Sequence, residues 1–96
     1  MHDKEQILSY LHEHKAEFQR KYGVEEIGLF GSFARGDAKA ESDIDLLVSM
    51  PSTFDNVMNL KFELEESLHK KVDLLTKHKY MKPFLLEMIS KDIVYV

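Results

Sequence analysis

Two aspartates one residue apart, Asp43 and Asp45, open the most apolar stretch of the chain. Aspartate is a poor strand former, and two like charges that face the same way repel each other. Side chains alternate between the faces of a strand, so both carboxylates project from one face, roughly 6–7 Å apart. Oxygen ligands at this spacing suit a hard divalent cation such as Mg²⁺, which offsets the repulsion. The pair therefore predicts a cation site.

A third carboxylate, Asp73, interrupts a second apolar run and predicts an extension of this site. If its strand neighbours the strand of Asp43 and Asp45, the three carboxylates converge. Three converging acids can hold two metal ions about 3.5–4 Å apart, an arrangement used for in-line phosphoryl chemistry. Taken alone, Asp73 has a simpler interpretation, which is an ion pair with Lys70 or Lys71.

The dipeptide Gly31-Ser32 predicts the phosphate-binding half of the same site. It follows a predicted strand and opens a turn or helix, where glycine lets the backbone approach a ligand closely. Amides at a helix start point at anions, and the serine hydroxyl adds a donor. A Gly-Ser dipeptide alone usually marks a turn. Its combination with Asp43 and Asp45, which follow after ten intervening residues, indicates a site for a metal-bound nucleoside triphosphate.

The elements that must position these residues follow from the apolar periodicity of the chain. Helices are predicted over 4–22, near 54–70 and near 80–90, and strands over 24–30, 43–48, 71–76 and 93–96, with a short turn or helix within 32–42. This order predicts an α/β fold, a small mixed β-sheet packed with helices. The connection between the first two strands is too short for a roomy crossover and favours an antiparallel pair. The helix near 80–90 is expected to face inward with Phe84, Leu85, Met88 and Ile89.

Composition bounds the class of protein. The 96 residues are 44% apolar, which predicts a single domain over 1–96 with a modest core. The net charge of −4 disfavours direct binding of nucleic acid, which usually needs a basic face. No apolar run approaches the ~20 residues of a membrane span, and we expect no membrane association. Cysteine is absent and the N-terminus lacks a signal-type stretch, so we expect a cytoplasmic protein.

The run from Gly31 to Gly36, followed by Ser42 to Val48, resembles the minimal nucleotidyltransferases, or MNT proteins, of the polymerase-β-like nucleotidyltransferase superfamily. The resemblance covers essentially the whole chain. It implies a polymerase-β-like core that transfers a nucleoside monophosphate from a nucleoside triphosphate and releases pyrophosphate. Asp43 and Asp45 would hold two Mg²⁺ ions, and Asp73 would hold the catalytic ion and help to deprotonate the acceptor hydroxyl.

The resemblance also implies roles for the residues of the phosphate turn. Gly31 and Ser32 would bind the β- and γ-phosphates, and Arg35 would steady the phosphate or the loop. The simpler interpretation of Arg35 is an ion pair with Asp37 or Glu41.

The resemblance further implies a partner, because many MNT proteins are antitoxins paired with HEPN-type RNase toxins. Some of them add AMP from ATP to a tyrosine of the toxin, which predicts ATP as substrate and a hetero-oligomer with the toxin. Two alternatives remain at this point. One is an antitoxin that inhibits by contact alone and keeps a vestigial site, and the other is a nucleotidyltransferase that acts on a small molecule such as an aminoglycoside.

Overall fold

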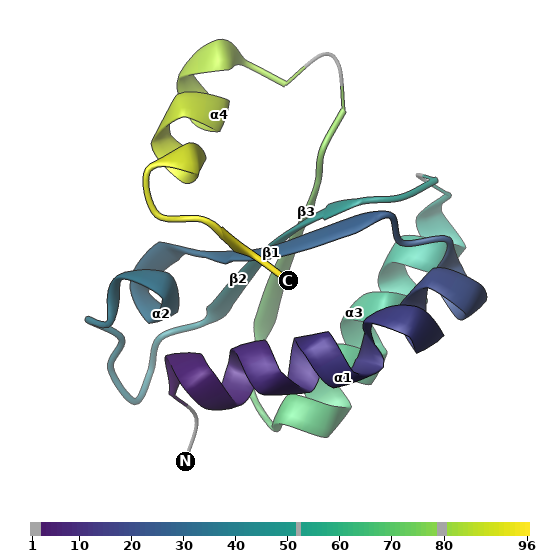
Figure 1. The fold of residues 1–96 in the computed structure, drawn as a ribbon, viewed down its shortest axis with the longest axis horizontal. Coiled ribbons are helices and arrows are strands. Elements are labelled where there is room, and N and C mark those ends of the chain that lie inside the picture. Colours follow the sequence, from purple (N-terminus) through teal and green to yellow (C-terminus); the bar gives the residue numbers. More distant parts are fainter. Residues whose placement is uncertain (1–2, 52, 79–80) are drawn as a thin grey trace.

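A computed structural model of the chain describes residues 3–51, 53–78 and 81–96. Its elements follow the predicted order closely (Figure 1). They are α1 (Lys4–Tyr22), β1 (Glu26–Phe30), α2 (Gly31–Arg35), β2 (Ile44–Ser49), α3 (Phe54–Leu68), β3 (Val72–Thr76), α4 (Pro83–Ser90) and β4 (Val94–Tyr95). Within the described ranges, no helix is both long enough and apolar enough to cross a membrane.

The four strands form one mixed sheet in the order β3-β2-β1-β4. β1 is antiparallel to β2 and to β4, whereas β2 and β3 run parallel. The predicted antiparallel pairing of the first two strands is therefore confirmed. β2 and β3 can run parallel because α3 supplies the longer crossover that a parallel pair needs.

The helices α1 and α3 cover one face of the sheet and enclose the main core with it (Figure 1). α1 begins at a capping box in which Asp3 and Gln6 bond each other's backbone amides, and Gly23 ends it in the left-handed conformation. Its residues Ile7 and Leu11 are fully buried. The strands β1, β2 and β3 contribute their inward side chains to this core: Ile27, Leu29, Ile44, Leu46, Val48 and Val72.

The helix α4 lies over the opposite face of the sheet (Figure 1). Beneath it is a smaller cluster, whose buried members are Leu47, Met81 and Ile89. The prediction that Ile89 faces inward is confirmed. The prediction is wrong for Phe84, Leu85 and Met88, which are 74%, 40% and 49% exposed. An eight-residue helix on an open sheet face packs only one stripe, and in a helix that is apolar on several sides periodicity alone does not select that stripe.

Candidate active site

The parallel pairing of β2 and β3 places Asp45 directly beside Asp73, with their Cα atoms in register. Both side chains lie on the sheet face opposite α1 and α3, because their neighbours Ile44, Leu46 and Val72 are buried in the main core on the other face. The predicted convergence of these two strands is therefore present in the structure.

Asp43 lies immediately before the first residue of β2 and is half-buried. The segment that leads to it is closed by two bonds between Lys39 and Ser42, one from the Lys39 amide to the Ser42 hydroxyl at 2.8 Å and one from the Ser42 amide to the Lys39 carbonyl at 3.0 Å. The Ile44 amide then donates to the Lys71 carbonyl at 3.0 Å and starts the pairing with β3. These hydrogen bonds set the position of Asp43 at the edge of the site.

The three carboxylates form an electrostatically unfavourable group. Burial raises the pKa of Asp45, and the negative charges of Asp73 and Asp43 raise it further, while the Arg35 guanidinium opposes the shift. Within the described part of the chain, none of the three acids accepts a hydrogen bond or forms an ion pair. A cluster of this kind favours a bound cation, since a cation offsets both the repulsion and the cost of burial.

Gly31 brings the turn that is predicted to bind phosphate close to Asp45. Its φ of +77° lies in the left-handed region, and a Cβ atom built there would collide with the Asp45 carboxylate, 3.0 Å from its Cγ and closer still to Oδ2. Only glycine permits this approach without strain. β1 thus delivers the turn directly onto Asp45, because its last residue, Phe30, is paired with Asp45 in the sheet.

Ser32 stands in the first turn of α2, beside Gly31. Its carbonyl accepts bonds from the amides of Gly36 and Asp37, both at 3.0 Å, and these bonds close the short helix. Its hydroxyl makes no hydrogen bond to any residue that the structure describes. The hydroxyl is therefore available as a donor to a ligand.

Arg35, in the last turn of α2, forms two ion pairs, with Asp37 and with Asp92, each at 3.2 Å. The simpler interpretation is thus confirmed for Asp37, and Glu41 forms no ion pair among the described residues. Asp92, which follows α4, was not expected from the sequence. Because Arg35 also lowers the pKa of Asp45, its positive charge acts on the acidic group from α2.

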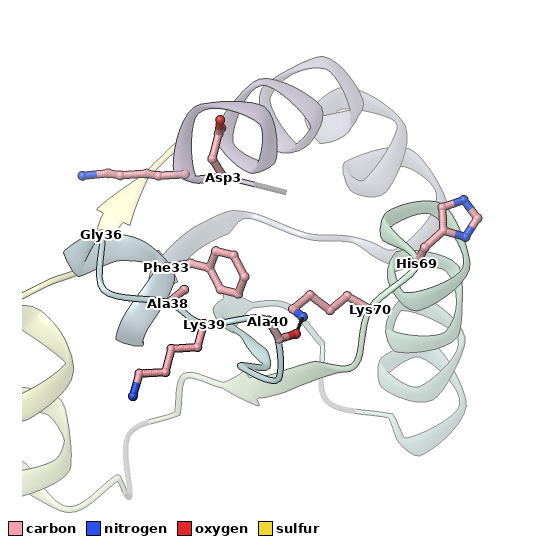
Figure 2. A pocket seen from close by; sticks show the side chains of 9 residues that line it. Asp3, Phe33, Gly36, Ala38, Lys39, Ala40, His69 and Lys70 are labelled. Carbon is pink, nitrogen blue, oxygen red and sulfur yellow. Dashed lines mark hydrogen bonds between the residues drawn. The ribbon is translucent and has the colours of Figure 1, made fainter. Parts of the chain in front are cut away.

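Lys70 is a positioning residue that sequence reasoning did not find (Figure 2). Its ammonium donates to the Ala40 carbonyl at 2.6 Å and lies 5.8 Å from the centre of the Phe33 ring. This hydrogen bond stabilises the loop between α2 and Asp43. The proposed ion pair of Asp73 with Lys70 or Lys71 is absent from the described residues, which leaves the Asp73 carboxylate unpaired. No local signal in the sequence links Lys70 to a carbonyl thirty residues away.

A cavity of about 520 Å³ opens behind the same loop, between the start of α1 and the end of α3 (Figure 2). Phe33, Ala38 and Lys70 line it, and the six residues predicted for the site are absent from its described lining. The candidate site instead lies on the sheet face, where Asp73 is exposed and Asp45 is half-buried.

Comparison with known proteins decides the family. The family model described as nucleotidyltransferase domain matches residues 11–96. The chain belongs to this nucleotidyltransferase family. Protein adenylyltransferase MntA of Thermococcus cleftensis is 42% identical over 98 residues, a match that covers 96% of this chain and 94% of the relative. A Methanocaldococcus jannaschii protein, provisionally named protein adenylyltransferase MJ1379, is 39% identical over 95 residues and covers 95% of both chains.

Solved structures confirm the nucleotidyltransferase fold. A protein provisionally described as a minimal nucleotidyltransferase superposes with a TM-score of 0.79 at 28% identity, over 97% of this chain and 95% of that one. A complex of tri-AMPylated Shewanella oneidensis HEPN toxin with MNT antitoxin superposes with a TM-score of 0.60 at 20% identity, over 96% of this chain and 66% of that one. The second likeness, at this identity, concerns the fold alone. The predicted α/β class, the mixed sheet and the assignment as a nucleotidyltransferase are confirmed.

The carboxylate oxygens of this nucleotidyltransferase suit Mg²⁺ better when substrate phosphates supply further ligands than when the protein is their only source. In the described ranges, no three Asp, Glu, His or Cys side chains stand close enough to form a ready-made metal site. Mg²⁺ is commonly held by one or two carboxylates together with substrate phosphates and water, so a complete protein cage is not required. The repulsion on Asp45 and the oxygen-only ligands are consistent with an ion that binds together with a triphosphate.

Proposed function

We propose that this nucleotidyltransferase transfers AMP from ATP, with Mg²⁺, to a tyrosine hydroxyl of a HEPN-type RNase toxin and acts in the cytoplasm as its antitoxin. The observation that carries the proposal is the contact of the Gly31 turn with Asp45, beside Asp73 and Asp43. It unites the predicted phosphate-binding turn and a cluster of unpaired carboxylates on one sheet face.

In this proposal Asp43, Asp45 and Asp73 hold two Mg²⁺ ions. When bound, Mg²⁺ neutralises the phosphate charge that builds up in the transition state and orients the reacting oxygens. Asp45 is central because it neighbours Asp73 in the sheet, Gly31 in space and Asp43 in sequence. Its raised pKa is the electrostatic consequence of that central position.

Gly31 and Ser32 bind the β- and γ-phosphates. The Gly31 backbone approaches the acids closely, and the free Ser32 hydroxyl donates a hydrogen bond to phosphate oxygen. Arg35 steadies the loop through Asp37 and Asp92, and its charge faces the same region. Together these residues hold the leaving pyrophosphate while the α-phosphorus lies over Asp45 and Asp73.

The reaction exchanges a phosphoanhydride bond of ATP for a phosphodiester bond between AMP and the acceptor. The acceptor oxygen forms a bond to the α-phosphorus, the bond from that phosphorus to the bridging oxygen of the β-phosphate breaks, and pyrophosphate leaves with the bonding electrons. Asp73 accepts the hydroxyl proton and returns it to solvent. A phenol, with a pKa near 10, gives up this proton more readily than an aliphatic alcohol.

A protein acceptor is supported by the relatives and by the exposure of Asp73. The Thermococcus relative is named a protein adenylyltransferase, and the Shewanella complex contains an AMPylated HEPN toxin. The net charge of −4 disfavours RNA as acceptor. A protein acceptor supplies its own docking surface and holds its hydroxyl in line with the α-phosphorus, where orientation contributes most to the rate.

Intact-mass spectrometry of the RNase, after incubation with this chain, ATP and Mg²⁺, tests the proposal. We expect a gain of one or more AMP masses that requires Mg²⁺ and disappears with Asp43→Asn. An unchanged RNase mass, with RNase activity still suppressed by the Asp43→Asn protein, would favour inhibition by contact alone. Transfer of AMP to an aminoglycoside but not to the RNase would favour a small-molecule acceptor.

A further inference from the structure

The helix α4 presents an apolar surface to solvent that its own fold does not use. Phe84, Leu85 and Met88, which we call the α4 patch, are 74%, 40% and 49% exposed. They are three of the five large hydrophobic side chains that are exposed in the described residues, and all three stand on one eight-residue helix. Such a concentration of exposed apolar side chains is typical of an interaction site.

The packing of α4 onto the sheet explains why the patch remains outside. Ile89 is buried and Leu86 is half-buried, and these two side chains contact the cluster that contains Leu47. The polar neighbours Glu87 and Ser90 are exposed. One apolar stripe of α4 thus packs on the sheet, and a second apolar stripe, the α4 patch, faces solvent. Packing within this chain explains the first stripe but not the second.

The helix that carries the α4 patch packs on a strand of the candidate active site. Leu47, on which α4 packs, lies two residues after Asp45 on the same strand and the same face. α1 and α3 occupy the other face, so α4 is the helix that flanks the approach to Asp45 and Asp73 (Figure 1). A protein that brings a hydroxyl to these acids meets the sheet face on which α4 packs.

A second connection ties α4 to the phosphate turn. Asp92, two residues after the end of α4, pairs with Arg35 of α2 at 3.2 Å. The helix is therefore joined to the site at two places, through Leu47 on β2 and through Arg35 on α2. The helix that carries the patch is therefore fixed in position relative to the acids.

We infer that the α4 patch is the docking surface for the protein acceptor, which covers Phe84, Leu85 and Met88 with an apolar surface of its own and so aligns its hydroxyl with the site. The inference rests on the proposed function, because it assumes a protein acceptor. An acceptor is a better occupant than a second copy of this chain, since α4 packs on the strand and face that carry Asp45, and a second copy there would compete with the acceptor.

Steady-state kinetics of AMP transfer to the HEPN-type RNase test the docking surface. In the double variant Phe84→Ser and Met88→Ser, we expect the KM for the RNase to rise about 10–100-fold, because a few central apolar anchors carry most of the energy of such interfaces. AMP transfer to N-acetyltyrosinamide, a small acceptor that needs no docking, should be unchanged. Phe62→Ser is the matched control, since Phe62 is 56% exposed on α3, across the sheet.

Three outcomes would overturn the docking surface. The KM for the RNase could be unchanged in the double variant, Phe62→Ser could raise it equally, or sedimentation could show a dimer of this chain that the double variant abolishes.

Binding of the RNase to Asp43→Asn protein, with and without the double variant, separates this inference from the proposed function. If wild-type chain transfers no AMP but Asp43→Asn binds the RNase through the α4 patch, the catalytic proposal fails and the docking surface stands. If no binding occurs, the docking surface is wrong.

Discussion

Two partly buried carboxylates, Glu63 and Asp45, lie in opposite electrostatic environments. Glu63, between α1 and α3, accepts a bond from the Tyr22 hydroxyl at 2.6 Å and pairs with Lys21 at 2.7 Å. Burial raises its pKa, but these partners outweigh burial, and its pKa is lowered overall. Asp45, beneath the phosphate turn, has acids as neighbours, and its pKa is raised.

Ionised Glu63 stabilises the fold, whereas ionised Asp45 destabilises it. Lys21 and Tyr22 favour the charged form of Glu63, so its ionisation adds to the free energy of unfolding. The neighbours of Asp45 disfavour its charged form, so its ionisation subtracts from that free energy. Functional sites commonly keep such unfavourable groups, because a ligand supplies the missing charge.

The largest expected effect on the rate of AMP transfer comes from removing a carboxylate of the acidic group around Asp45. Asp43→Asn should lower the rate of AMP transfer by at least about 10³-fold, because metal-based charge stabilisation supplies several kcal/mol. Circular dichroism should show a retained fold. Asp55→Asn, at an exposed position on α3, is the control and should keep normal turnover. Near-normal turnover of Asp43→Asn would contradict the metal assignment.

Gly31→Ala should disrupt the contact that distinguishes Asp45 from an ordinary surface acid. The new Cβ would collide with the Asp45 carboxylate, and a displacement near 1 Å in an active site can cost about 10²-fold in rate. Gly36→Ala is the matched control, because Gly36 also has a positive φ, of +86°, but a Cβ there meets nothing within 4 Å. Equal losses in the two variants would show that backbone strain alone is responsible.

Ser32→Ala should have a smaller effect on the same site. One hydrogen bond to a charged phosphate is worth roughly 1.5–3 kcal/mol, so we expect a loss of about 10–100-fold in kcat/KM for ATP. Ser90→Ala, at an exposed position on α4, provides the reference. If the two variants lose activity equally, Ser32 is a turn residue without a phosphate contact.

The smallest effects concern stability, and they should have opposite signs in the two regions. In EDTA at pH 7, Asp45→Asn should raise Tm by a few degrees and Glu63→Gln should lower it by a few degrees, since about 1 kcal/mol moves Tm by roughly 4–8 °C in a small domain. Adding Mg²⁺ and ATP should raise the Tm of wild-type protein but not that of Asp45→Asn. A fall in Tm for Asp45→Asn in EDTA would show that the surroundings of Asp45 do not disfavour its charged form.

The pH dependence of these Tm differences tests independently the opposite directions of the two pKa shifts. The folded-state pKa of Asp45 is raised, so the advantage of Asp45→Asn should be absent below the unfolded value near 3.9 and complete above the raised pKa. The pKa of Glu63 is lowered, so the disadvantage of Glu63→Gln should be complete above the unfolded value near 4.3 and vanish as pH falls through the lowered pKa. Thermal melts between pH 3 and pH 8 measure both windows.

Local sequence signals were sufficient for most elements and for the acids. Asp3, Gln6 and Gly23 mark the ends of α1 by capping chemistry that acts within a few residues. Alternation along β2 separates Asp45 from the buried Ile44 and Leu46, since strand side chains alternate faces wherever the strand lies. The predicted roles of the site residues in catalysis stay predictions until the variants are measured.

Only the tertiary structure decided which distant groups meet. The register of β2 with β3 sets Asp45 beside Asp73, and sheet pairing brings Gly31 against Asp45. Lys70 donates to the Ala40 carbonyl instead of pairing with Asp73, and Arg35 pairs with Asp92. The sequence offers each of these two residues several possible partners, and the closure of the loops and the packing of the helices decide which one it contacts. The outward stripe of α4 has the same origin, since the sheet beneath offers contact to one side of a helix whose sequence is apolar on more than one.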